Sequence, residues 1–289
     1  KDGAEVDRAA AGDQVIVLTN QTPFYGESGG QTGDAGRIWT PEGLEFAVET
    51  TNKPLGRLHT HVGKLTGGSV KVGDAVHLEV DAERRDRIRA NHSATHLVHA
   101  ALRNRLGDHV TQKGSLVSED RFRFDFSHPK PLSDDDIAAI EAEVNEEIRA
   151  NEQVSTRLMT PDDAVAAGAL ALFGEKYGDK VRTVSIPGFS LELCGGTPVG
   201  ATGEIGLLKV IHESSISAGV RRLEAVTGHG AIGRFLESEG VLNRLSADLK
   251  VGRDGVEETV HRLSDQLRKT QKKLEKLQFR LAREQTGDV

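Results

Sequence analysis

Residues 91–98 have the sequence Asn91-His-Ser-Ala-Thr-His-Leu-Val98, within a stretch from Ala82 to Leu106 that predicts one long helix. On a helix, the four-residue spacing places His92 and His96 on one face, with Cβ atoms about 5–6 Å apart. Two imidazoles at that separation can share a metal ion. The pair alone is equally consistent with two unrelated histidines, because histidines at this spacing also occur by chance.

The sequence before this helix predicts a small β-barrel. From Gln14 to Val80, short apolar runs alternate with Gly-rich turns, as in Val15-Ile-Val-Leu18 and Glu45-Phe-Ala-Val48. Several short strands with turn signals at this spacing are typical of small barrels. We assign residues 1–84 to this domain.

Strands and helices are mixed after the helix, which Gly107 ends. Residues 114–117 and 121–126 predict strands, and helices are expected to begin after Ser133 and Thr160. Further strands are expected near residues 181–186, 190–193 and 206–211. This order predicts an α+β domain over residues 85–228.

Residues 229–289 predict a helical region. After a break at Gly252 to Gly255, a heptad seam begins in which Thr270 is the only polar residue. Its positions are Val256, Val260, Leu263, Leu267, Thr270, Leu274, Leu277 and Leu281. The seam predicts a helical hairpin or a coiled coil, so these helices either fold back on themselves or join two copies of the chain.

Composition limits the classes of protein. The 289 residues include 37 basic and 44 acidic side chains, a net charge of −7, so an RNA partner requires a local basic patch. No apolar run approaches the ~20 residues that span a bilayer, and no membrane partner is expected. The single cysteine, Cys194, excludes an internal disulfide and indicates a reducing, cytoplasmic location. Because the chain begins with Lys1 and Met159 is its only methionine, we expect a piece of a longer protein.

Cys194 lies in Leu191-Glu-Leu-Cys-Gly-Gly-Thr-Pro198, where a predicted strand enters a Gly-Gly turn. An isolated cysteine is usually a small buried apolar residue, but this turn leaves the thiol accessible. With His92 and His96 it would form a Cys/His₂ zinc site with an open fourth position. A cysteine nucleophile paired with one histidine is the alternative chemistry.

The segment Thr22-Pro-Phe-Tyr-Gly-Glu-Ser-Gly-Gly-Gln-Thr-Gly33 is rich in glycine. It matches neither a P-loop nor a dinucleotide-binding fingerprint. From these residues alone, a tight turn of the barrel is favoured over contact with phosphate.

Six ordered motifs, covering nearly the whole chain, resemble those of alanyl-tRNA synthetases. They are Thr22-Pro-Phe-Tyr with Ser28-Gly-Gly-Gln31, His92-Ser-Ala-Thr-His-Leu97, Gln112-Lys-Gly-Ser115, Leu172-Phe-Gly-Glu-Lys-Tyr-Gly178, Cys194-Gly-Gly-Thr197 and Arg221-Arg-Leu-Glu-Ala-Val-Thr-Gly228. The resemblance implies a barrel, then an editing core of the threonyl/alanyl-tRNA synthetase type, then the start of an oligomerisation region. The full-length parent would carry the aminoacylation core. Stand-alone editing proteins share the barrel and the histidine pair, but the last motif and the heptad seam favour the synthetase.

In the resembled family, two helix histidines, the cysteine and a histidine four residues after it hold zinc. Here that last position is Pro198, which has no side-chain ligand. Three outcomes follow: zinc bound more weakly with water in the vacant place, zinc bound with another group such as His212, or no zinc. We favour the first.

The resemblance also implies that Thr95 and Gln112 line the editing pocket. With Cys194 they are the candidate catalytic residues for hydrolysis of Ser-tRNA(Ala) and Gly-tRNA(Ala). Candidate phosphate contacts are Lys113, Arg121, Arg123, Arg221 and Arg222. The alternatives are a stand-alone trans-editing protein, a non-catalytic zinc and coiled-coil assembly module, and a cysteine-dependent hydrolase of small esters.

Overall fold

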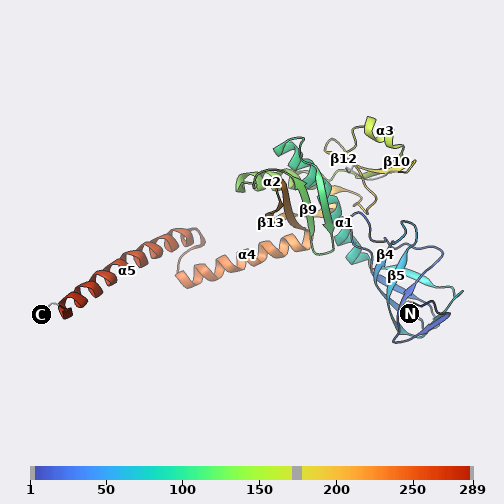
Figure 1. The fold of residues 1–289 in the computed structure, drawn as a ribbon, viewed down its shortest axis with the longest axis horizontal. Helices are drawn as coiled ribbons and strands as arrows, with labels where there is room; N and C mark the ends of the chain where they lie inside the picture. Colours follow the sequence, from blue (N-terminus) through green and yellow to red (C-terminus); the bar gives the residue numbers. More distant parts are fainter. Residues whose placement is uncertain (1–3, 171–177, 287–289) are drawn as a thin grey trace. The chain divides into compact units, whose positions relative to one another are not determined.

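The computed structural model describes residues 4–170 and 178–286. They form two compact units, one extending to Ile232 and one beginning at Gly233 (Figure 1). The described part contains five α-helices and antiparallel sheets, which confirms the mixed α and β class. Of the motif at residues 172–178, all but Gly178 lies outside the described residues.

The first sheet contains five antiparallel strands in the order β2-β5-β4-β3-β7. Its strands are β2 (Gln14–Val17), β3 (Gly36–Trp39), β4 (Glu45–Asn52), β5 (Thr60–Gly67) and β7 (His77–Val80), and a separate pair joins β1 (Arg8–Ala10) to β6 (Ser69–Lys71). Ile38, Phe46 and Leu65 are buried in its core. The predicted barrel is not confirmed: among the described strands, β2 and β7 are the edges of an open sheet. The chain between β2 and β3 forms no strand that could close it.

The long helix α1 (Ala82–Leu106) has the predicted bounds. Asp81 caps its start by accepting a hydrogen bond from the Arg84 amide, and Gly107 ends it with a φ of 112°, a conformation that glycine adopts without strain. Every residue from 90 to 102 is buried, because other elements cover α1 on several sides. The helix therefore holds its histidines inside the protein.

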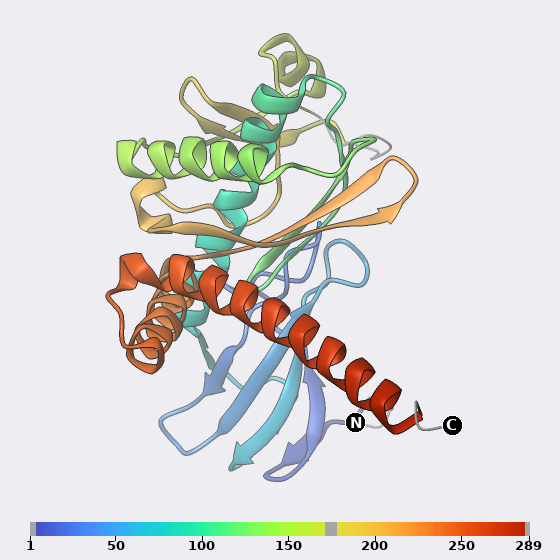
Figure 2. The same cartoon turned by 90° about the vertical axis from the view of Figure 1, so that its left-hand side faces the viewer.

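A four-stranded sheet in the order β13-β14-β9-β8 forms the main core together with α1 and α2 (Figure 2). The elements are β8 (Gln112–Val117), β9 (Phe122–Ser127), α2 (Asp134–Ala150), β13 (Leu208–Ser217) and β14 (Val220–Thr227). Phe122, Phe124 and Phe126 are fully buried, so the alternation that predicted β9 is confirmed. Strand β14 was not predicted, because Arg221 and Arg222 interrupt its apolar pattern.

A smaller sheet carries β10 (Ser155–Met159), β11 (Val181–Ile186) and β12 (Ser190–Leu193), in that order. Helix α3 (Pro161–Ala166) begins after Thr160, whose side chain accepts a hydrogen bond from the Asp163 amide. A short 3₁₀ helix, η1 (Thr202–Ile205), precedes β13. Strand β12 matters most for the site, since Cys194 follows its last residue.

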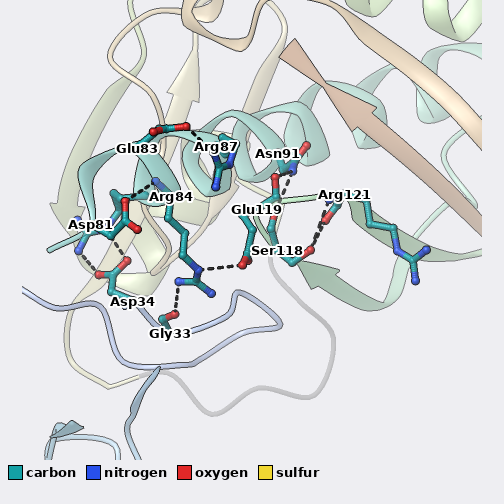
Figure 3. A network of polar contacts seen from close by, with 11 residues as sticks. Gly33, Asp34, Asp81, Glu83, Arg84, Arg87, Asn91, Ser118, Glu119 and Arg121 are labelled. Atoms are coloured by element: carbon teal, nitrogen blue, oxygen red, sulfur yellow. Dashed lines mark hydrogen bonds and ion pairs between the residues drawn. The ribbon is translucent and has the colours of Figure 1, made fainter. Parts of the chain in front are cut away.

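The start of α1 is tied to the segment before β3 and to the turn before β9 (Figure 3). Arg84 donates to the Glu119 carboxylate and to the Gly33 carbonyl, both at 2.9 Å. Arg85 forms an ion pair with Asp34, whose side chain is buried. These contacts fix the Gly-rich segment against the helix that carries the histidines.

The second unit is helical. It contains the greater part of α4 (Gly228–Leu249), a 3₁₀ turn η2 (Arg253–Gly255) and α5 (Val256–Thr286). Val256 is buried, but the other leucine and valine positions of the heptad seam are exposed. The predicted hairpin and coiled coil are therefore not confirmed, although the helix itself is. In the described part of the chain, no helix is both long and apolar enough to cross a membrane.

Candidate metal and substrate site

Three ligand atoms meet where α1 passes the end of β12. His92, His96 and Cys194 each offer one, and these atoms lie within 4.8 Å of one another. His92 Nε2 is 3.0 Å from Cys194 Sγ, and the two imidazole rings lie edge to face with centroids 4.9 Å apart. The structure thus brings together the three residues that the sequence pointed to, across 102 positions of the chain. We call them the metal cluster.

The charges of the metal cluster favour a thiolate beside an imidazolium in the metal-free protein. Burial alone raises the pKa of Cys194, but His92 and His96 outweigh it and hold that pKa well below its usual range. Burial alone lowers the pKa of His96, but Glu192 and Cys194 outweigh it and hold that pKa well above its usual range. A thiolate is the form of cysteine that binds metal or attacks an electrophile.

The donor set fits zinc, which binds thiolate sulfur and imidazole nitrogen. His96 Nε2 is buried and has no hydrogen-bond partner, as expected of an atom reserved for a ligand. Pro198 offers the cluster no side-chain ligand, and its carbonyl accepts a hydrogen bond from Arg89 at 2.9 Å. His212 lies on β13, opposite Glu224, and is not part of the cluster found among the described residues.

A cavity of about 390 Å³ opens beside the metal cluster. This volume is in the range of small-molecule sites. Thr95 and Gln112 line it, as the resemblance implied. The Thr95 hydroxyl donates to the Asn91 carbonyl at 2.9 Å, so its oxygen can still accept a hydrogen bond from a ligand. Gln112 contacts Ser115 through its amide nitrogen at 3.3 Å.

The Gly-rich segment also lines the cavity, through Tyr25, Ser28, Gly29 and Gln31. It therefore does more than form a turn of the first sheet, and whether it contacts phosphate stays a question for experiment. The Val117 amide donates to the Gly30 carbonyl, and the Thr32 amide donates to the Val117 carbonyl. Gly30 lies so close to Ser115 that a Cβ would overlap the Ser115 carbonyl oxygen. Its φ of 83° also favours glycine.

Cationic side chains that the sequence reasoning missed also line the cavity: Arg103, Lys180 and Arg182. Arg182 donates to the carbonyls of Cys194 and Gly196, at 3.1 and 2.7 Å, and so supports the loop that carries the thiol. Glu192, also missed, accepts hydrogen bonds from two imidazoles. The pattern Glu-Leu-Cys was a usable signal, because residues two apart on a strand lie on the same face.

The predicted phosphate contacts lie outside the cavity lining. Lys113 is exposed on β8. The four arginines lie beside carboxylates, pairing Arg121 with Glu224, Arg123 and Arg222 with Asp125, and Arg221 with Glu213. Each would have to exchange such a partner, at least in part, to bind phosphate.

Comparison with known families gives two matches. Residues 1–84 match the family described as tRNA synthetases class II (A). Residues 181–224 match the threonyl and alanyl tRNA synthetase second additional domain. The second match contains β12 and Cys194, so one of the three residues of the metal cluster lies in a segment that these two kinds of synthetase share.

Curated relatives extend the likeness to nearly the whole chain. An alanine–tRNA ligase of Sphingopyxis alaskensis is 62% identical over 279 residues, which is 95% of this chain and 32% of the relative. The enzymes of the same name from Rhizorhabdus wittichii and Parvibaculum lavamentivorans are 59% and 48% identical, over 98% and 97% of this chain and 33% and 32% of each relative. The chain thus spans about a third of the length of these relatives. With six family motifs in order and these identities, the chain belongs to the alanyl-tRNA synthetase family.

Proposed function

We propose that this chain hydrolyses the ester that joins serine or glycine to the terminal adenosine of tRNA(Ala), as the editing part of an alanyl-tRNA synthetase. The observation that carries the proposal is the cavity whose wall contains His92, His96 and Cys194 beside Thr95 and Gln112. The aminoacylation core would lie in the remaining two thirds of the protein, as the length of the relatives suggests.

The chemistry of the amino acids explains the need for such a site. A pocket that binds alanine rejects glycine weakly, because one missing methyl group is worth only about 1–3 kcal/mol. It also rejects serine weakly, since serine only adds a hydroxyl. A second site that hydrogen-bonds the hydroxyl reverses the preference, because alanine would leave polar groups unpaired.

The residues of the cavity have separate roles in this proposal. Thr95 and Gln112 bind and orient the serine hydroxyl, the first through its free lone pair and the second through its amide. His92, His96 and Cys194 would hold zinc, which when bound supplies Lewis-acid polarisation of an ester carbonyl or a water. Arg182 keeps Cys194 in place through the two carbonyls that it contacts.

The tRNA backbone would be bound by basic side chains. The candidates from the sequence are Lys113, Arg121, Arg123, Arg221 and Arg222. We add Arg103 and Lys180 as candidates because they line the cavity. A chain with net charge −7 needs such a local patch to bind RNA.

A second copy of the chain would cover the apolar seam of α5. Leu267, Leu274 and Leu281 are each more than half exposed, and they are spaced by whole heptads. A regular apolar stripe of this kind is stable in water when another helix covers it.

Deacylation of Ser-, Gly- and Ala-tRNA(Ala) by the pure chain tests the proposal. Rapid release of serine and glycine with Ala-tRNA(Ala) left intact is expected. Survival of Ser-tRNA(Ala) over the same period would contradict the proposal and would favour a non-catalytic assembly module. Cleavage of small esters without tRNA, unaffected by a chelator, would identify a cysteine-dependent hydrolase instead.

A further inference from the structure

A buried carboxylate links two histidines of α1. Glu192 accepts a hydrogen bond from His96 Nδ1 at 2.5 Å through one oxygen and from His99 Nδ1 at 2.7 Å through the other. Glu192, His96 and His99 are each less than 9% exposed. His99 belongs neither to the metal cluster nor to any of the family motifs noted above, so this three-residue arrangement needs an explanation of its own.

The two hydrogen bonds decide where each imidazole carries its proton. A carboxylate oxygen can only accept, so a hydrogen stays on Nδ1 of both rings. In a neutral imidazole the other nitrogen then has the lone pair. For His96 this nitrogen is Nε2, which is buried, makes no hydrogen bond of ordinary geometry, and lies within 4.8 Å of the other two ligand atoms of the metal cluster. When His96 gives up a proton to bind a metal, that proton therefore leaves from Nε2, because Glu192 keeps the other hydrogen on Nδ1.

His99 holds the carboxylate from the opposite side. Its ring packs against Phe124, with centroids 5.1 Å apart, which fixes the position of the imidazole. The backbone of Glu192 is also fixed, since β12 pairs Glu192 with Val184 of β11. With both oxygens occupied and the strand in place, the carboxylate cannot turn away from His96.

We propose that Glu192, held in place by His99, is a positioning residue that fixes the tautomer and ring orientation of His96 for metal binding. The inference rests on the metal part of the proposed function and is independent of which aminoacyl ester is hydrolysed. Partners of this kind around metal ligands typically contribute 10- to 100-fold to metal affinity. Such support matters more here, because Pro198 leaves the cluster with three protein side-chain ligands.

The test is zinc affinity, measured by competition with a chromophoric chelator, in variants of the whole chain. In Glu192→Gln the amide oxygen can accept from only one Nδ1–H, so one imidazole must shift its proton or turn; a 10- to 100-fold loss of affinity is expected. His99→Leu leaves one Glu192 oxygen without a donor, so its loss of zinc affinity should be smaller than that of Glu192→Gln. His99→Asn should recover most of that loss, because its amide N–H can replace Nδ1–H.

Glu141→Gln is the matched control. Glu141 is a partly buried carboxylate on α2 that accepts from the Val210 amide and pairs with Lys209, away from the cavity lining. Its substitution should lower the melting temperature of the metal-free protein without changing zinc affinity. Histidine ¹⁵N shifts of the zinc-loaded protein should show His96 bound through Nε2 and protonated at Nδ1.

The inference is overturned if Glu192→Gln binds zinc as tightly as the unmodified chain, or if the unmodified chain binds no zinc. It is also overturned if His99→Leu and His99→Asn have equal affinities. If instead Glu192→Gln loses zinc while the unmodified chain fails to hydrolyse any tRNA ester, the proposed function is wrong and the positioning role of Glu192 stands.

Discussion

Gln31 and Thr197 are 166 positions apart and share two hydrogen bonds. The Gln31 amide nitrogen donates to the Thr197 hydroxyl at 2.9 Å, and the Thr197 backbone amide donates to the Gln31 side-chain oxygen at 3.0 Å. Gln31 is only 2% exposed, so water does not replace these bonds easily. The pair fastens the Gly-rich segment to the loop after Cys194.

This pair predicts a measurable coupling. Gln31→Ala should destabilise the protein by about 1–3 kcal/mol, because it leaves buried polar groups without partners. Thr197→Val removes only the hydroxyl partner and should cost less. A double-mutant cycle on the free energy of unfolding should give a coupling of about 0.5–1.5 kcal/mol. Additive effects would show that the hydroxyl bond does not contribute.

The two glycines after Cys194 predict opposite results for the same substitution. A Cβ on Gly196 would overlap His92 Nε2 and the Gln31 side chain, whereas a Cβ on Gly195 meets no atom within 4 Å. Gly196→Ala should therefore displace the imidazole and weaken zinc binding at least tenfold, and Gly195→Ala should leave it within about twofold. Equal affinities in the two variants, measured by chelator competition, would contradict the geometry of the cluster.

Acid should remove the contribution of Glu192 to the stability of the metal-free protein. Burial alone raises the pKa of Glu192, but the charge of His96 and the hydrogen bonds from His96 and His99 lower it to about 2. A carboxyl group with a lowered pKa stabilises the fold above its unfolded pKa of about 4.3, and this stabilisation is lost as the pH falls towards 2.

The free energies of unfolding of the unmodified chain and of Glu192→Gln should therefore differ most above pH 5. The gap should narrow steadily between pH 4.5 and pH 3, since a protonated carboxyl resembles the glutamine amide in charge. Urea unfolding of the metal-free proteins at pH 7, 5 and 3 measures this. If the difference in unfolding free energy stays constant from pH 7 to pH 3, His96 and His99 do not lower the pKa of the Glu192 carboxyl.

The seam of α5 predicts a concentration-dependent dimer. Leu274→Lys or Leu277→Lys places a charge on the apolar stripe and should weaken self-association at least tenfold. Phe279→Lys is the control, because Phe279 is 72% exposed and, two positions after Leu277, lies on roughly the opposite side of the helix. Sedimentation velocity over a range of concentrations distinguishes them. A chain that stays monomeric at high concentration would contradict the prediction.

Local signals in the sequence were sufficient for most of the helices. Helix α1 begins after Asp81 and ends before Gly107, Ser133 caps α2, and the heptads of α5 form one continuous helix. The long-range pairing of strands was less accessible. The order β13-β14-β9-β8 depends on contacts between distant segments. Strand β14 could not be recognised from its apolar pattern, because Arg221 and Arg222 interrupt it. In the fold these two arginines pair with carboxylates of the neighbouring strands.

The site could be predicted where residues that bind metal lie within short sequence motifs. The spacing of His92 and His96 and the isolated Cys194 indicated three ligands, and the structure places them together. Gln31 and Glu192 were missed as parts of the site because their roles depend on neighbours far along the chain: Thr197 for the first, and His96 with His99 for the second. The Glu-Leu-Cys spacing places Glu192 on the same face as Cys194, but it does not identify the histidines that Glu192 contacts.

The central claim is that His92, His96 and Cys194 form one metal site that serves hydrolysis in the adjacent cavity. Zinc content and Ser-tRNA(Ala) hydrolysis should be measured on the same sample before chelation, after chelation and after zinc is restored. We predict that zinc content and the rate of hydrolysis fall together on chelation and recover together when zinc is restored. At full activity the chain should hold about one zinc ion. Full hydrolysis by chelated protein that holds no zinc would contradict the claim.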